Sequence, residues 1–165
     1  MRLPLLIACA GLLAACGNGA PGGPAPKGKA CAASGQGPVR VENAWMRAQS
    51  DPGGMSAAYF TICNATSESV TIEGVAAPAA GLIELHETSR DTAGVVSMAP
   101  TGPIVLAAGE EAVFEPGGKH AMMMNLIAPI DAGSPQTLTI ELAGGESVTV
   151  DAMVMTAADA ASHHH

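Results

Sequence analysis

Two histidines and two methionines stand at spacings that could build a metal site. His120 and Met122 are separated by one residue in the stretch KHAMMM, and His86 and Met98 precede them. A neutral imidazole offers a nitrogen and a thioether offers a sulfur to a metal ion. Two ligands from one segment leave a tetrahedral ion half open, so a second pair is needed. We therefore predict a metal site made of His86, Met98, His120 and Met122.

Short β-strands must position these side chains. From residue 39 onward, apolar segments are separated by turn residues, and no convincing amphipathic helix is present. Residues i and i+2 of a strand share a face, so His120, Met122 and Met124 point to one side and Met123 to the other. A hairpin that turns at RDTAG would bring Met98 to face His86. We expect strands at 39–48, 55–64, 69–77, 81–88, 94–100, 103–106, 111–116, 120–127, 136–142 and 147–155.

This pattern predicts an all-β domain, a sandwich or a barrel, over residues 39–156. Aromatic residues are scarce, with one Trp, one Tyr and two Phe, so the core must consist of Val, Ile, Leu, Met and Ala. Met123 is expected in the core and Met124 at the edge of the site. Four further methionines are assigned to packing: Met46, Met55, Met153 and Met155. Of these, Met55 could also lie near the metal.

The N-terminal residues have the pattern of an export signal. Residues 1–15 hold one positive charge at Arg2 and an apolar run too short to span a bilayer. The ending LAAC is similar to the bacterial lipobox and predicts lipidation of Cys16; the alternative is a plain signal peptide cleaved nearby. Residues 16–38 then form a Gly/Pro-rich tether predicted to be flexible. We expect a lipoprotein in the periplasm, held to the membrane through its lipid alone.

The cysteines fit an exported protein. Cys9 is removed with the signal and Cys16 is expected to be lipidated, so Cys31 and Cys63 are the remaining cysteines. No C-x-x-C or thiol cluster indicates zinc or thiol exchange. A Cys31–Cys63 disulfide is compatible with an oxidising compartment. Two free thiols are the alternative, because the sequence does not give their separation.

The spacing of the four candidate ligands resembles that of the PCu(A)C family of periplasmic copper chaperones. His86 is followed by Glu87, ten residues and Met98; twenty-one further residues lead to His120-Ala121-Met122. Some family members have Met at the position of Glu87, which is the optional one. The resemblance extends to ELHET, PGGKH and GGMSAAYFTICN and covers about residues 39–155.

The resemblance implies a cupredoxin-like fold, an immunoglobulin-like Greek-key β-sandwich, that binds one Cu(I) through His86, Met98, His120 and Met122. It also implies copper delivery to exported cuproproteins, such as the Cu(A) centre of cytochrome c oxidase or the factors that assemble it. The residue types agree, since thioethers select Cu(I) and imidazole also binds copper. Imidazole must be neutral to bind, so affinity is expected to fall as the pH drops toward about 5.

Other functions are less consistent with the sequence. A blue-copper electron-transfer site needs a Cys thiolate, and no cysteine follows Cys63. A metal-free structural lipoprotein domain is the second alternative. No nucleophile–base constellation or carboxylate pair indicates an enzyme. The formal charge of −8, or −9 without Arg2, argues against a nucleic-acid partner.

The C-terminal residues 157–165 are expected to form a disordered tail that ends in three histidines. This ending could bind Cu(II), or it could be the remnant of a purification tag. The candidate Cu(II) ligands are His163, His164 and His165.

Overall fold

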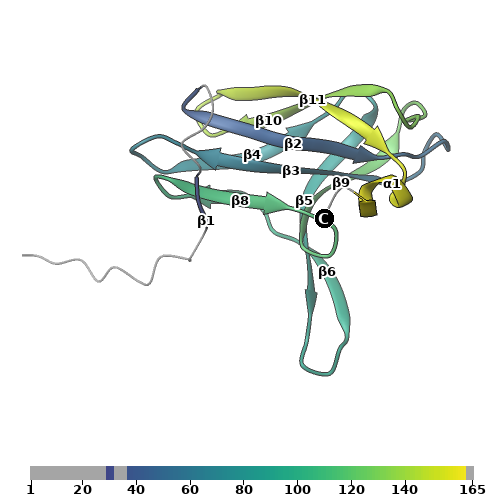
Figure 1. The fold of residues 1–165 in the computed structure, drawn as a ribbon, viewed down its shortest axis with the longest axis horizontal. Helices are drawn as coiled ribbons and strands as arrows, with labels where there is room; N and C mark the ends of the chain where they lie inside the picture. The colour runs from purple at the N-terminus through teal and green to yellow at the C-terminus, as the bar shows by residue number, and fades with distance from the viewer. Residues whose placement is uncertain (1–28, 32–36, 163–165) are drawn as a thin grey trace, which may run out of the picture.

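The structure is a computed structural model that describes residues 29–31 and 37–162. This part of the chain forms eleven strands and one short helix. Figure 1 shows how they are arranged. The strands are β1 (Lys29–Ala30), β2 (Val39–Arg47), β3 (Ser56–Asn64), β4 (Val70–Ala76), β5 (Ala80–Arg90), β6 (Val96–Pro100), β7 (Ile104–Leu106), β8 (Glu110–Phe114), β9 (Lys119–Leu126), β10 (Pro135–Leu142) and β11 (Ser147–Met155). The helix is α1 (Ala157–Ser162).

The strands form one mixed, curled sheet that closes over a core as a β-sandwich. Its hydrogen-bonded order is β6-β5-β9-β8-β3-β2-β11-β10-β4-β7, and β1 pairs with β8. Most pairs are antiparallel; β11 with β2 and β8 with β9 are parallel. The sheet curls until β4 and β5 also lie side by side. The prediction of an all-β sandwich is confirmed, and each of the ten strands expected from the sequence is present.

The core is mostly aliphatic and contains one stacked pair of phenylalanine rings. Phe60 and Phe114 lie opposite each other on β3 and β8, with ring centroids 4.2 Å apart. Met46 and Met123 are fully buried, as predicted, whereas Met55 and Met153 are exposed and do not pack in the core. The packing role expected for these last two residues is therefore wrong. Met153 lies on the outer face of β11, and Met55 lies just before the start of β3.

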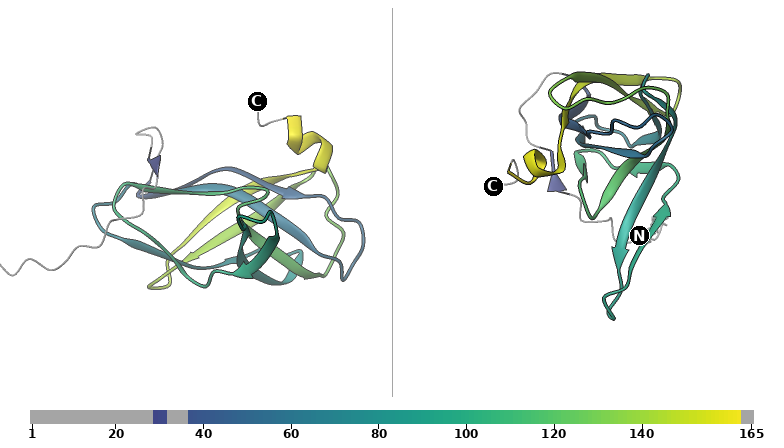
Figure 2. Two further views of the ribbon diagram at one scale, coloured as in Figure 1. Left: turned by 90° about the horizontal axis from the view of Figure 1, so that it is seen from below. Right: turned by 90° about the vertical axis from the view of Figure 1, so that its right-hand side faces the viewer.

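The hairpin of β5 and β6 extends beyond the sandwich (Figures 1 and 2). Its turn is fixed by Asp91, whose Oδ1 accepts hydrogen bonds from the backbone N–H groups of Ala93 and Val95 at 2.9 and 2.8 Å. Gly94 supplies the positive φ of 84° that the turn requires. All five residues of β6 are exposed, and β6 is an edge strand that pairs only with β5. β6 therefore has little packing beyond its ladder with β5.

A disulfide joins Cys31 to Cys63, with their Cα atoms 5.5 Å apart. It fastens β1 to the sandwich, where Lys29 and Ala30 pair with Glu111 and Glu110 of β8. The prediction of a flexible tether over residues 16–38 is therefore wrong for residues 29–31, because a covalent bond and a strand ladder hold them. The signal at 1–15 and the lipidation site Cys16 lie outside the described residues.

The predicted disordered tail is also wrong for residues 157–162, which form α1. Thr156 and Asp159 make a capping box: the Asp159 N–H donates to Thr156 Oγ1 at 3.2 Å, and the Thr156 N–H donates to Asp159 Oδ2 at 3.3 Å. Ala160 is buried, so apolar packing stabilises the helix in addition to the capping box. His163, His164 and His165 lie outside the described residues. In residues 37–162, no helix is both long and apolar enough to cross a membrane.

Candidate metal centre

The four predicted ligands lie on three neighbouring strands and one face of the sheet. His86 is on β5, Met98 on β6, and His120 and Met122 on β9. Directly opposed residues of antiparallel strands share a face. His86 opposes His120 in the β5–β9 ladder, and Glu84 opposes Met122. The intervening residues of β9 point into the core, so the alternation predicted for this strand is confirmed.

His120 is held between a backbone carbonyl and a thioether. Its side chain is largely enclosed, with 7% of the residue exposed. Nδ1 lies 3.1 Å from the carbonyl oxygen of Gly118, and Nε2 lies 3.1 Å from Sδ of Met98. A carbonyl oxygen only accepts, so Nδ1 must carry the proton of a neutral ring. The lone pair of Nε2 then points toward the sulfur.

His86 has the complementary arrangement. Its Nε2 lies 3.1 Å from Oε2 of Glu84, and a carboxylate accepts, so Nε2–H is the donor. Its Nδ1 is buried and has no hydrogen-bond partner among the described residues. The rings of His86 and His120 are tilted at 48° with centroids 6.0 Å apart. Each neutral ring thus has one anchored N–H and one nitrogen with a free lone pair.

The two methionines differ in exposure. Met98 is 52% exposed on the edge strand and lies opposite Thr88, while His86 lies opposite Pro100. The expected direct opposition of His86 and Met98 is therefore wrong: the two are diagonal neighbours, and the Met98 sulfur approaches His120. Met122 is half-buried, between Glu84 of β5 and Ala57 of β3. The register places it on the face of the other three ligands.

This arrangement suits a soft cation better than a proton. Nε2 of His120 and Sδ of Met98 are both electron-pair donors 3.1 Å apart, and in the neutral ring no hydrogen lies between them. Imidazole ligands usually donate their second ring N–H to a carbonyl or a carboxylate, the roles that Gly118 and Glu84 have here. Within the described residues, no group of three or more His, Cys, Asp or Glu is placed to hold a metal.

Two aromatic residues support His120 from the β3 side. Tyr59 lies 6.4 Å from the His120 ring, measured between centroids, and Trp45 stacks on Tyr59 at 4.3 Å. Burial raises the pKa of the Tyr59 phenol above its ordinary value, and the positive charge of Arg47 partly opposes this shift. The phenol therefore stays neutral near pH 7. Sequence reasoning missed these rings, as well as Glu84 and Gly118, because cross-strand neighbours leave no spacing signal.

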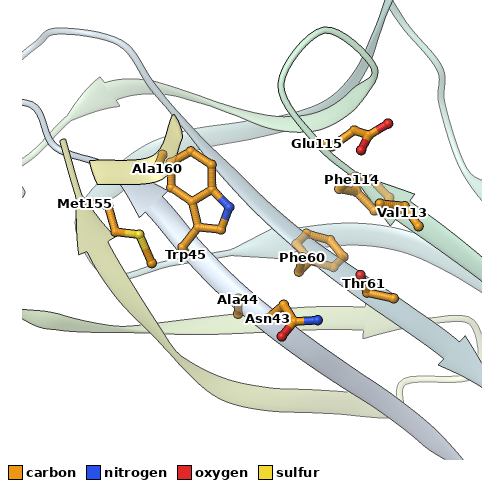
Figure 3. Close-up of a pocket in the computed structure, with 10 residues that line it drawn as sticks. All are labelled: Asn43, Ala44, Trp45, Phe60, Thr61, Val113, Phe114, Glu115, Met155 and Ala160. Carbon is orange, nitrogen blue, oxygen red and sulfur yellow. The ribbon is translucent and has the colours of Figure 1, made fainter. Parts of the chain in front are cut away.

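A groove of about 450 Å³ lies on the other side of Trp45. Figure 3 shows Trp45 beside Met155 and Ala160, with Asn43 and Ala44 farther along the groove. Asn43 has a φ of 54°, and the β2–β3 register shifts between Glu42 and Trp45, so a bulge opens the groove here. None of the four candidate ligands lines it. The groove is thus a separate feature.

Comparison of the sequence with protein families gives one match over most of the folded part. The model described as "Putative lipoprotein LpqE-like" matches residues 39–154. The chain is 33% identical over 113 residues to "Putative lipoprotein Lxx21020" of Leifsonia xyli, covering 68% of this chain and 66% of that protein. It is 29% identical over 85 residues to "Uncharacterized protein RP573" of Rickettsia prowazekii, covering 51% of this chain and 46% of that protein. The chain therefore spans just under two thirds and about half of these relatives.

Solved structures similar to this chain include PCuAC domains, in agreement with the resemblance found in the sequence. The copper-bound PCuAC domain of PmoF2 has a TM-score of 0.60 at 20% identity, covering 74% of this chain and 97% of that domain. Apo-DR1885 of Deinococcus radiodurans has a TM-score of 0.54 at 27% identity, covering 85% and 96%. The Cu(I) form of DR1885 has a TM-score of 0.51 at 26% identity, covering 71% and 79%. The family resemblance and the predicted fold class are confirmed.

Proposed function

The chain belongs to the LpqE-like lipoprotein family, and we propose that it is a copper chaperone of the cell envelope. It binds one Cu(I) through His86, Met98, His120 and Met122. The observation that carries the proposal is that Nδ1 of His86 and Nε2 of His120 are both left with free lone pairs, the second of them 3.1 Å from the Met98 sulfur. The fold shared with copper-bound and Cu(I)-bound relatives supports the choice of ion.

The ligand set explains why this protein carries copper rather than reacting with it. Thioether and imidazole ligands suit Cu(I), and neither forms a disulfide on oxidation. Met98 is exposed, so an acceptor's own ligand can displace its sulfur first. The ion then leaves by stepwise ligand exchange and remains Cu(I). A carrier of this kind has no catalytic residue.

Electron transfer of the blue-copper type is not supported. Such a site requires a cysteine thiolate. Cys31 and Cys63, the two cysteines in the described residues, are bonded to each other. An intense blue colour on addition of Cu(II) would contradict this conclusion.

An anaerobic competition titration against a Cu(I) chelator tests the site. The full chain carries His163→Ala, His164→Ala and His165→Ala, so that the predicted Cu(II) site of the tail cannot contribute. One equivalent should be retained by this chain and lost from it on adding His86→Ala or Met122→Leu. Met153→Leu, an exposed methionine on β11, is the matched control and should bind normally. Equal retention by all variants would refute the site.

We further propose that the acceptor is an exported cuproprotein, such as the copper subunit of cytochrome c oxidase or its assembly factor. The chain would act in the periplasm, anchored by a lipid on Cys16. Copper-loaded chain mixed with the apo oxidase subunit should transfer its ion, measured as copper in the separated subunit. Retention of all the copper by the chain would contradict this choice of acceptor.

A further inference from the structure

Two methionines next to the candidate centre have no role in the proposed function. Met55, just before β3, is 54% exposed, and Met124 of β9 is half-buried. Apolar side chains on the outer face of a sheet gain little from burial, so core packing does not explain them. Their positions relative to Met122 follow from the strand register.

Extending the β3–β9 register by one residue places Met55 opposite Met124. Ala57 opposes Met122 and Ser56 opposes Met123 in the β3–β9 ladder. The pairing continues past Met124, because the Leu126 N–H donates to the carbonyl of Gly54 at 3.3 Å. Asn125, with a φ of 51°, departs from extended geometry between these points. Met55 therefore faces Met124 across the two strands.

Both side chains lie on the metal-binding face. Met124 follows Met122 by two residues on one strand, so the two share a face, about 6.8 Å apart along the strand. Met55 is two residues before Ala57, which is on that face as well. Opposed residues have Cβ atoms about 4.5–5.5 Å apart, and Met has three rotatable side-chain bonds. The two sulfurs can thus converge on one ion beside Met122.

We propose that Met55 and Met124 form a second, weaker Cu(I) position, through which the ion enters the His86–Met98–His120–Met122 centre. Met122 is the ligand shared between the two positions. Thioethers are soft ligands suited to Cu(I), and the ion moves by exchange of one sulfur for another without a change of oxidation state. This inference rests on the proposed function for its direction of transfer, but not for the binding position itself.

The nearby charges are consistent with weak binding at the second position. Arg47 donates through Nη2 to the backbone carbonyl of Met55 at 3.2 Å, so a positive charge stands on that side. Glu84, opposite Met122, carries the compensating negative charge on the other side. An ion beside Arg47 is repelled more than one beside Glu84. The gradient favours movement from Met55 and Met124 toward the centre.

NMR of methionine methyl groups during an anaerobic Cu(I) titration tests the proposal. The full chain with His163→Ala, His164→Ala and His165→Ala is labelled at the methionine methyl carbons. The first equivalent should shift the methyls of Met98 and Met122, and the second those of Met55 and Met124. Met153, 45% exposed on β11, is the matched reference and should not respond. Unmoved methyls at Met55 and Met124, or an equal response at Met153, would overturn the proposal.

Variants separate this position from the main centre. Met55→Leu and Met124→Leu should abolish binding of the second equivalent in the NMR titration and leave the first unchanged. Leu82→Met, which adds a thioether opposite Met124, should tighten the second. In a chain with both His86→Ala and His120→Ala, Met55 and Met124 should still respond, so failure of the main centre is distinguishable from failure of the second position.

Discussion

The two sides of the candidate centre differ in how firmly the protein holds them. His120 on β9 is buried on the outer face of the sheet and anchored through Nδ1, whereas Met98 on β6 is exposed on an edge strand of a projecting hairpin. Yet Nε2 of the first and Sδ of the second lie 3.1 Å apart. A carrier needs both properties: one side that keeps the ion's geometry and another that an acceptor can reach.

His86 links the two sides. It is on β5, the strand shared by the sandwich and the hairpin, and pairs with both His120 and Pro100. Its anchor, Glu84, is exposed, unlike the backbone anchor of His120. The order of release expected from this difference is Met98 first, the His86 imidazole next and the His120 imidazole last.

The largest effect on folding is expected from removing the disulfide. This bond stabilises the sandwich, which carries His120, and does not touch the β5–β6 hairpin, which carries Met98. Cys31→Ala with Cys63→Ala opens a loop with a sequence separation of 32. The loss in free energy of unfolding should be about 3–4 kcal/mol by loop entropy. Denaturant titration measures it, and Cu(I) affinity of the folded protein should not change. An unchanged free energy of unfolding, or a large loss of Cu(I) affinity, would contradict the distinction between the two sides of the centre.

The next effect is the contrast between ligands of the two sides. His120→Ala should lower Cu(I) affinity by more than about 100-fold, since outer partners of a ligand alone are typically worth 10–100-fold. Met98→Leu should lower it by a smaller factor and mainly accelerate release to a chelator. Competition titration and stopped-flow release measure the two quantities, with circular dichroism as the control for folding. Equal losses for both variants would show that the exposed side is not the labile one.

A smaller effect is expected at Glu84, the anchor of His86. Glu84→Ala removes the acceptor at 3.1 Å from Nε2, so both neutral tautomers of the ring become populated and affinity should fall by about tenfold. Glu84→Gln retains an acceptor oxygen and should recover most of the loss. Long-range proton–nitrogen NMR identifies the protonated ring nitrogen. A His86 ring protonated at Nε2 in the Ala variant would contradict the anchoring role.

The smallest effect concerns Tyr59, the ring beside His120 on the sandwich side. Burial raises its pKa, so the phenolate absorbance should titrate above the ordinary value, and Arg47→Gln should raise the pKa further. The sign for stability follows: this contribution is complete below the unfolded pKa of about 10 and is lost as the pH rises through the folded value. Tyr59 is the one tyrosine of the chain, so its titration is unambiguous. A pKa below the ordinary value would mean that the ring is not buried.

The sequence predicted the strands and the shared face of His120 and Met122 because both follow from local alternation. Ala121 and Met123 alternate into the core, and this pattern needs no knowledge of neighbouring strands. The predicted hairpin brought His86 and Met98 together, and the family spacing supported adding them to His120 and Met122. Local pattern alone gave the hairpin but not its register, and the opposition of Met98 to Thr88 was missed for that reason.

Other features could not be read from the sequence because they depend on contacts between distant segments. The Gly/Pro-rich composition predicted a flexible tether, and the Cys31–Cys63 bond overrides it at residues 29–31. The T-A-A-D sequence at residues 156–159 does contain a capping signal, but a six-residue helix is too short to be expected from periodicity. Glu84 gave no signal as an anchor, since exposed carboxylates are common on strands.

The carbonyl oxygen of Gly118 has a consequence for how the ion could be released. It accepts the ring N–H of His120 at 3.1 Å and the backbone N–H of Thr88, at the base of the hairpin, at 3.0 Å. A single oxygen atom thus couples the position of the β5–β6 hairpin to the orientation of the buried His120 imidazole. An acceptor that displaces β5 would weaken both hydrogen bonds to this carbonyl. The His120 ring would then be free to rotate away from the metal ion. The affinity for the copper ion would then fall only when an acceptor is bound, so the ion would stay bound at all other times.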